Sequence, residues 1–179
     1  MQISICGTPG SGKSTVARII AEKLHYKYYS VGELRRKAAE KRGLTIYEFN
    51  QLKEDTDTFF DNIQKEIGEK EDNFVIEGRL SFHFVPKSLK IFFKTDLRKA
   101  AERVFKDQRE TEKTYKSVEE AREEMQERMD NDKRRYKMHY NLDPYDEKQF
   151  DAVLDTTGIA VDEVVEKVMK EVNKHREAC

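Results

Sequence analysis

The chain has 179 residues, enough for one domain with a buried core. Charged side chains make up 39% of it, against about 25% in an average domain, yet the net charge is −1. This mixture of signs does not indicate a nucleic acid partner, and no apolar run reaches the roughly 18 residues of a membrane span. Cys6 lies in an apolar run and Cys179 is the last residue, so we expect no disulfide and a cytoplasmic protein.

Five short runs rich in β-branched or aromatic residues predict strands, at 3–6, 27–29, 74–77, 89–93 and 152–154. Apolar residues at helical spacing fill the gaps and predict helices over 13–24, 31–42, about 46–68, 97–107, 118–138 and 160–174. Strands that alternate with helices predict an α/β fold. We expect a three-layer sandwich, in which a five-stranded parallel sheet has helices on both faces.

Two segments are longer than the connections that such a sandwich needs. Residues 31–72 form a helical, charged excursion, and residues 106–135 are charged at more than half of their positions. A segment so poor in apolar residues is expected to stand out into solvent. It can be a plain solvated helical hairpin, or both segments can be flaps that exclude water from a reaction. The second interpretation predicts a core of 1–30, 73–105 and 139–179, a flap of about 31–72 and a lid of about 106–138.

Residues 7–14 read GTPGSGKS and match the phosphate-binding loop G-x-x-x-x-G-K-[ST]. Its glycines let backbone N–H groups face a polyphosphate, while Lys13 reaches the β- and γ-phosphates and the Ser14 hydroxyl binds Mg²⁺. A strand before the loop and a helix after it place the phosphates at a helix N-terminus. We therefore predict a site for ATP and Mg²⁺. Its loop residues are Gly7, Thr8, Pro9, Gly10, Ser11, Gly12, Lys13, Ser14 and Thr15.

Further polar side chains follow the second and third strands, at the edge where open α/β sheets bind ligands. Ser30 and Arg35 offer a hydroxyl and a guanidinium for a phosphate, although a helix cap beside a surface arginine is the alternative. Gly78 and Arg79 end the next buried run abruptly. Glu77 precedes them and can be a buried acid paired with a base.

Arg128, Asp132 and Arg135 lie four and three residues apart, so they share one helix face. Guanidiniums on that face could neutralise charge on a transferring group, while Asp132 orients them or meets a nucleotide. The alternative is a surface helix held by salt bridges.

Four stretches resemble the cytidylate kinases, and the short archaeal type more than the bacterial one: GTPGSGKSTVARIIAEKL, YYSVGELRRKAAEKRG, FVIEGRL and ERMDNDKRRY. The resemblance covers nearly the whole chain. It implies a nucleoside monophosphate kinase with an NMP-binding flap and a lid, which moves the γ-phosphoryl group of ATP to CMP or dCMP. The expected partners are therefore small nucleotides, with no nucleic acid and no membrane, and we expect a monomer.

The resemblance also assigns residues. Ser30 and Arg35 match NMP-site positions, and Gly78 and Arg79 match the place where an arginine binds the acceptor phosphate. Glu77 stands where related enzymes hold an acid near Mg²⁺. The lid residues reproduce the pattern R-x-x-x-D-x-x-R of bacterial relatives, in which Asp132 is assigned to the NMP. The implied catalytic residues are Lys13, Arg79, Arg128 and Arg135.

Arg103 matches a lid arginine on the ATP side, although the second such arginine, expected four residues on, is replaced by Asp107. Asp57 and Asp61 match acidic positions of the archaeal type, and a carboxylate can accept a hydrogen bond from the cytosine amine. The family often has an arginine near position 62, where this chain has Asn62. Residues 155–158 either lie beside the adenine or form a plain turn.

Three other functions stay open at this point. An adenylate kinase would show an acid-Gly-Phe-Pro-Arg turn after the third strand, whereas residues 77–81 read EGRLS. A kinase of a metabolite such as shikimate shares the loop and the size. A slow ATPase switch is the third, and only the basic and aromatic residues of 133–140 favour it.

Overall fold

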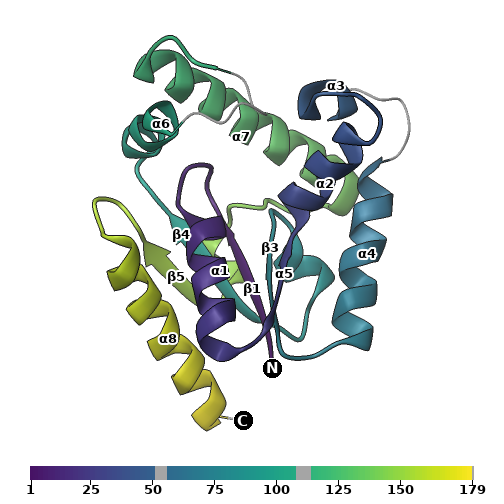
Figure 1. Cartoon of the computed structure of the whole chain (residues 1–179), viewed down its shortest axis with the longest axis vertical. Coiled ribbons are helices and arrows are strands. Elements are labelled where there is room, and N and C mark those ends of the chain that lie inside the picture. Colours follow the sequence, from purple (N-terminus) through teal and green to yellow (C-terminus); the bar gives the residue numbers. More distant parts are fainter. Residues whose placement is uncertain (51–55, 108–113, 179) are drawn as a thin grey trace.

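The computed structural model describes residues 1–50, 56–107 and 114–178. One parallel sheet with strand order β2-β3-β1-β4-β5 forms its centre (Figure 1). The strands are β1 (Gln2–Gly7), β2 (Lys27–Ser30), β3 (Phe74–Glu77), β4 (Leu89–Lys94) and β5 (Ala152–Asp155). Each predicted strand lies within an observed one, so the five-stranded parallel sheet is confirmed.

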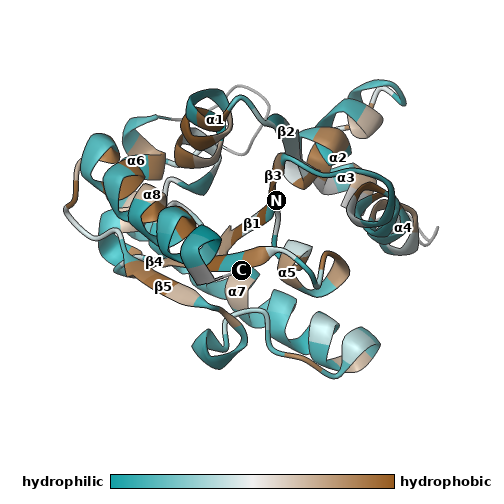
Figure 2. Cartoon of the chain, turned by 90° about the horizontal axis from the view of Figure 1, so that it is seen from below, coloured by the Kyte–Doolittle hydropathy of each residue, from teal (hydrophilic) through white to brown (hydrophobic). Residues whose placement is uncertain are grey.

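Helices cover both faces of the sheet, as predicted (Figures 1 and 2). Helices α1 (Lys13–Leu24) and α8 (Val161–Ala178) pack on one face, against Ile3 and Ile5 of β1 and alternate residues of its neighbours. The other face is covered by α4 (Thr56–Lys70), α5 (Ser81–Phe84) and the end of α7 (Val118–Tyr140). Cys6 points to that second face, since successive side chains of a strand alternate.

The region between β2 and β3 is helical, as predicted. After α2 (Val31–Glu40), the described residues of the helix expected over 46–68 lie in α3 (Ile46–Asn50) and α4, and residues 51–55 between them lie outside the described residues. Helix α5 and the 3₁₀ turn η1 (Glu147–Gln149) were not predicted, because elements this short show no helical period.

The charged segment 106–135 is largely exposed where it is described, as its composition predicts. Helix α6 (Leu97–Lys106) precedes it, and Ala121 and Met125 of α7 are buried against Ala100 and Ala101 of α6. A narrow apolar stripe thus docks α7 on α6, while most of the helix faces solvent. Residues 108–113 lie outside the described residues.

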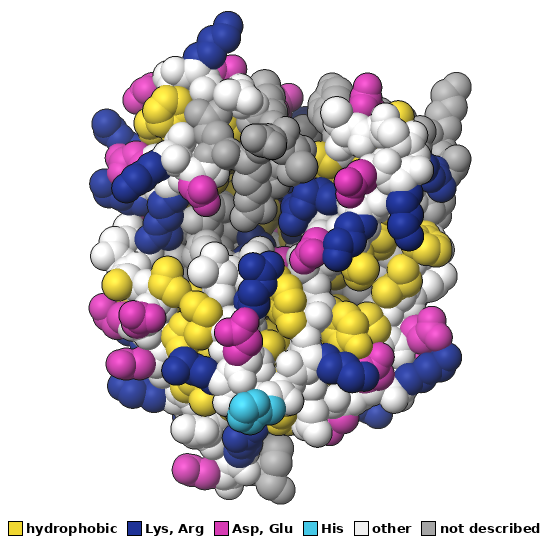
Figure 3. All heavy atoms as spheres, in the orientation of Figure 1, with side chains coloured by type: hydrophobic (Ala, Val, Ile, Leu, Met, Phe, Trp, Pro, Cys, Tyr) yellow, Lys and Arg dark blue, Asp and Glu magenta, His cyan; other side chains and the backbone are white. Residues whose placement is uncertain are grey.

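The remaining expectations from composition concern the surface and the cysteines. Figure 3 shows positive and negative side chains interspersed over the face seen in Figure 1. None of the described helices combines the length and apolar character needed to cross a bilayer. Cys6 is a buried free thiol, and Cys179 lies outside the described residues.

Candidate active site

The candidate site lies where β1, β2 and β3 end. The sheet register pairs Ser30 of β2 with Glu77 of β3 and Glu77 with Ile5 of β1, so their carboxyl ends meet at one edge. Helix α1 begins at that edge directly after the loop of residues 8–12. In open parallel sheets this edge is where ligands bind.

The phosphate-binding loop packs directly on β4. The backbone N–H of Thr8 donates to the Phe93 carbonyl at 3.0 Å, and a Cβ at Gly7 would lie 2.2 Å from that oxygen. Glycine is thus required at position 7 by this close approach. Gly12 caps α1 without a side-chain hydrogen bond to the first turn. The first N–H groups of α1 therefore have no side-chain cap, an arrangement suited to an anion.

Lys13 lies across the loop. Its Nζ donates to the Thr8 carbonyl oxygen at 3.1 Å, and Ser11 Oγ donates to the same oxygen at 2.8 Å. Burial of the ammonium group lowers the pKa of Lys13 to about 8, although the Glu77 carboxylate acts in the opposite direction. The loop thus holds the lysine in place, and the negative phosphates of a bound polyphosphate would favour its charged form.

The Glu77 side chain joins the end of β3 to the end of β2 and to the first turn of α1. Ser14 Oγ donates to Glu77 Oε1 at 3.1 Å, and the Ser30 hydroxyl donates to the same oxygen. The side chain is buried with 4% of its area exposed. Ser30 also accepts a hydrogen bond from the Glu33 N–H at 3.1 Å and so caps α2. The helix-cap interpretation of Ser30 is thus correct, and its hydroxyl contacts the site as well.

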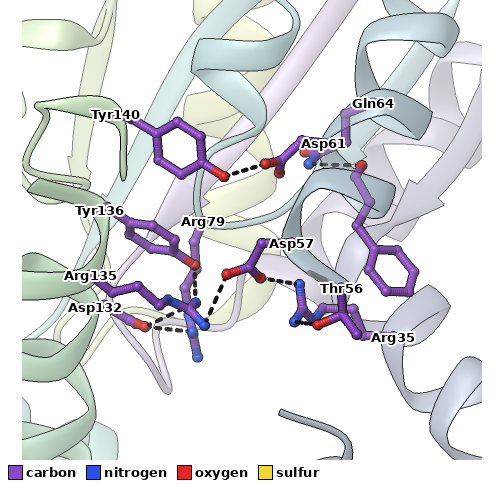
Figure 4. A network of polar contacts seen from close by, with 11 residues as sticks. Arg35, Thr56, Asp57, Asp61, Gln64, Arg79, Asp132, Arg135, Tyr136 and Tyr140 are labelled. Carbon is purple, nitrogen blue, oxygen red and sulfur yellow. Dashed lines mark hydrogen bonds and ion pairs between the residues drawn. The ribbon is translucent and has the colours of Figure 1, made fainter. Parts of the chain in front are cut away.

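Three arginines and two carboxylates alternate in a chain of contacts, which we call the arginine cluster (Figure 4). Arg79 Nη1 lies 2.7 Å from Asp132 Oδ1, and Arg135 Nη2 lies 3.8 Å from the same oxygen. Arg135 Nη1 lies 3.3 Å from Asp57 Oδ2, and Arg35 Nη1 lies 2.7 Å from Asp57 Oδ1. The cluster thereby connects α2, α4, α7 and the turn after β3.

An ion pair offsets the burial of Arg79. Burial alone would lower the pKa of Arg79, but the adjacent Asp132 carboxylate raises it above its usual range. Tyr145 OH donates to the other oxygen of Asp132 at 3.0 Å, so both oxygens of this buried carboxylate are engaged. The sequence analysis missed Tyr145, because only the folded chain brings the 140–150 segment to α7.

Asp57 and Asp61 differ in their surroundings. Both oxygens of Asp57 are occupied by guanidiniums, whereas Asp61 accepts a hydrogen bond from the Tyr140 hydroxyl through Oδ2. Gln64 lies one turn further along α4 and is fixed by donating to the Phe60 carbonyl at 3.3 Å and accepting from Ser81 Oγ at 2.8 Å. Tyr140 and Ser81 were not predicted, although α7 carries Tyr136 and Tyr140 one helical turn apart.

The remaining predicted site residues are Gly78, Arg103 and Arg128. A Cβ at Gly78 would lie 2.5 Å from Ser81 Oγ, so the chain turns tightly beside Arg79. Arg103 donates to the Thr156 carbonyl at 2.6 Å and to the Gly10 carbonyl at 3.5 Å, which ties the turn after β5 to the loop. Arg128 lies close enough to Lys13 to lower its pKa. Asn62 is exposed on α4.

The comparisons with known proteins agree on one family. The Cytidylate kinase-like family matches residues 2–158. A cytidylate kinase of Archaeoglobus fulgidus is 38% identical over 96% of this chain and 94% of its own length. Another, of Methanocella arvoryzae, is 35% identical over 97% of this chain and 99% of its own.

Solved structures agree with the fold. A shikimate kinase of Bacteroides thetaiotaomicron superposes with a TM-score of 0.65 at 16% identity, covering 97% of this chain and 98% of that one. This likeness concerns the fold alone. The family match spans most of the chain, and the archaeal relatives align over nearly their full length. The chain therefore belongs to the cytidylate kinase-like family.

Proposed function

We propose that this protein is a cytidylate kinase, which transfers the γ-phosphoryl group of ATP to CMP or dCMP and releases ADP with CDP or dCDP. The family match and the names of the archaeal relatives support this activity. The observation that carries it is the placement of two anion sites around Glu77. Glu77 contacts Ser14, which directly follows the phosphate-binding loop and Lys13, and Arg79 of the arginine cluster follows Glu77 by two residues.

On the donor side, residues 7–15 hold the phosphates of ATP. Backbone N–H groups at the start of α1 face the phosphates, and Lys13 bridges the β- and γ-phosphates. Arg103 holds the turn at Thr156 against the loop, which positions the backbone of residues 155–158 beside the adenine.

The side chains of Ser14, at the start of α1, and of Glu77, at the end of β3, fit Mg²⁺. A hydroxyl at Ser14 and a carboxylate at Glu77 are hard oxygen ligands, and they lie 3.1 Å apart. When bound, the ion neutralises charge on the phosphates of ATP. Phosphate oxygens of ATP and water would supply the remaining ligands of the ion.

On the acceptor side, Arg35 and Arg79 align the phosphate of the monophosphate, with Ser30 and Gly78 beside them. Arg128 and Arg135 stabilise the charge that spreads over the transferring group. Asp132 orients Arg79 and Arg135, since it contacts both. Asp57 holds Arg35 and Arg135 in the same way, and Asp61 is the better placed of the two α4 acids for the base.

We further propose that residues 31–72 act as the flap and residues 106–138 as the lid. The two segments meet through the Asp57–Arg135 contact, so their closure would bring acceptor and donor together without water. The monomeric state and the cytoplasmic location stay predictions. Light scattering coupled to size-exclusion chromatography tests the first, and cell fractionation tests the second.

One assay tests the activity. ADP production from ATP and Mg²⁺ is measured with CMP, dCMP, UMP, AMP, GMP and shikimate in separate reactions. Strong stimulation by CMP or dCMP is expected. A preference for AMP or for shikimate would overturn the assignment in favour of another small-molecule kinase, and turnover that ignores every acceptor would indicate an ATPase switch.

A further inference from the structure

Two polar contacts join α4 to α7, and we call them the first and the second rung (Figure 4). The first is the ion pair of Asp57 with Arg135, and the second is the hydrogen bond from Tyr140 to Asp61. Asp57 and Asp61 are one turn apart, about 6 Å along the helix axis. The first rung belongs to the arginine cluster. The second rung therefore lies about one ribose away from the place proposed for the acceptor phosphate.

The second rung is built to hold a carboxylate in one orientation. Asp61 is buried, with 9% of its area exposed, and the Tyr140 hydroxyl engages its Oδ2 atom. Among the described residues, the other oxygen, Oδ1, accepts no hydrogen bond. An ionised carboxylate only accepts hydrogen bonds. Oδ1 is thus available to accept a hydrogen bond from a donor supplied from outside the protein.

The bases of the two common pyrimidine nucleotides differ at this point. Cytosine presents an amine at position 4, which donates, whereas uracil presents a carbonyl oxygen, which only accepts. Two acceptors facing each other in a buried site repel and leave both groups without a hydrogen bond. A fixed acceptor therefore selects cytosine both by attraction and by exclusion of uracil.

We propose that Tyr140 is a positioning residue for base selection: its hydroxyl holds Asp61 as the hydrogen-bond acceptor for the cytosine amine and so excludes UMP. This inference rests on the proposed function. It gives the last turn of α7 a role in choosing the base, while the same helix contributes Asp132 and Arg135 to the phosphate side. A single helix thus spans the acceptor from phosphate to base.

Tyr140 acts on the protonation state of Asp61. Burial raises the pKa of Asp61, and the hydrogen bond from Tyr140 opposes that rise. A protonated Asp61 would become a donor and would tolerate the carbonyl oxygen of uracil. The other charged or titratable groups around the pair come from four helices: Asp57 and Lys65 of α4, Arg35 of α2, His83 of α5, whose ring lies 6.0 Å from that of Tyr140, and Tyr136 and His139 of α7.

The test replaces Tyr140 by phenylalanine, which keeps the ring packed against Phe84 and Tyr136. We expect the ratio of kcat/KM for CMP to kcat/KM for UMP to fall about tenfold, the effect of one hydrogen bond to a charged group. The KM for ATP should stay unchanged. The acid limb of the CMP profile should move to higher pH, because the Asp61 pKa rises without its donor.

Tyr29→Phe is the matched control. Tyr29 OH also donates to a carboxylate, Glu71 Oε2, at 2.8 Å, and it lies on β2 away from the second rung. Its CMP-to-UMP ratio should equal that of the parent enzyme. An unchanged ratio in Tyr140→Phe, or an equal loss for both substrates, would overturn the inference.

A second variant keeps the test decisive if Tyr140→Phe unfolds. Asp61→Asn has nearly the same shape but adds a donor, so UMP use should rise relative to CMP. Where Tyr140→Phe is folded, the effects of the two substitutions should not add in the double variant, because Tyr140 acts only through Asp61. Additive effects contradict the proposal. If the parent enzyme shows no stimulation by CMP at all, the proposed function fails instead, so the two failures are distinguishable.

Discussion

Arg79 and Asp132 are 53 positions apart in the chain, yet Arg79 Nη1 lies 2.7 Å from Asp132 Oδ1. The arginine follows β3 and the aspartate lies on α7, so this pair ties α7 to the edge of the sheet. Asp132 keeps only 5% of its side chain exposed. A buried carboxylate needs a partner, and the arginine in turn is fixed where the acceptor phosphate is proposed to bind.

Replacing Arg79 by lysine tests its role in acceptor binding. Lysine keeps the charge but loses the planar fork that binds phosphate and carboxylate together. We expect the KM for CMP to rise at least about tenfold, with the KM for ATP nearly unchanged. Arg79→Ala should in addition lower the free energy of unfolding by about 2 kcal/mol, because the buried Asp132 loses its nearest cation. Steady-state kinetics and thermal melts measure both, and unchanged acceptor kinetics would refute the assignment.

Arg103 should affect the donor alone. Arg103→Ala removes its hydrogen bonds to the Thr156 and Gly10 carbonyls and loosens the loop against the turn after β5. We expect the KM for ATP to rise about fivefold to tenfold, the loss of about one hydrogen bond from a charged donor. Arg98→Ala on the exposed side of the same helix is the control. A rise in the KM for CMP of equal size would show that Arg103 is not specific to the ATP side.

Gly7 gives a prediction about stability. Alanine at position 7 would place its Cβ 2.2 Å from the Phe93 carbonyl oxygen, so β1 and β4 must separate there. Gly43 also has a positive φ, of 67°, but no atom lies within 4 Å of its Cβ position. We expect Gly43→Ala to cost about 1 kcal/mol through backbone strain alone and Gly7→Ala to cost more. Denaturant titrations compare the two variants, and equal losses would contradict the structure.

The sheet and the loop could be predicted because their signals are local. Each strand of the sheet is a short β-branched or aromatic run, and the GTPGSGKS motif carries its own geometry. Helix α5 could not be predicted, since four residues show no helical period. The docking of α7 on α6 depends on the small residues Ala100, Ala101 and Ala121 meeting face to face. Only the folded chain shows that such residues share an interface.

Some features of the site could likewise be predicted from the sequence, and others could not. The pattern of Arg128, Asp132 and Arg135 was visible as a helix face, but its partners on α2, α4 and β3 were not. Asp57 and Asp61 are both acids, one helical turn apart, so their spacing alone could not assign them different roles. The tertiary structure separates them, because guanidiniums hold the first and a tyrosine holds the second. Long-range partners of this kind leave no trace in a single sequence.

Lys13 predicts a basic limb in the dependence of activity on pH. Burial lowers the pKa of this lysine to about 8, so the free enzyme loses the cation as the pH rises through that value. The negative phosphates of ATP favour the charged form and raise the pKa in the complex. Hence kcat/KM for ATP, which reports the free enzyme, should fall above about pH 8, whereas kcat should fall only at higher pH.

Lys13→Arg separates this charge effect from the loss of the residue. Arginine stays protonated across the whole range, so the basic limb in kcat/KM for ATP should disappear even though its larger head group lowers turnover. Lys13→Ala should reduce kcat by about two orders of magnitude or more at every pH, since no cation then meets the transferring group. Initial rates from about pH 6 to about pH 10 give the profiles. A basic limb that persists unchanged in Lys13→Arg would assign it to another group and remove Lys13 from the titration.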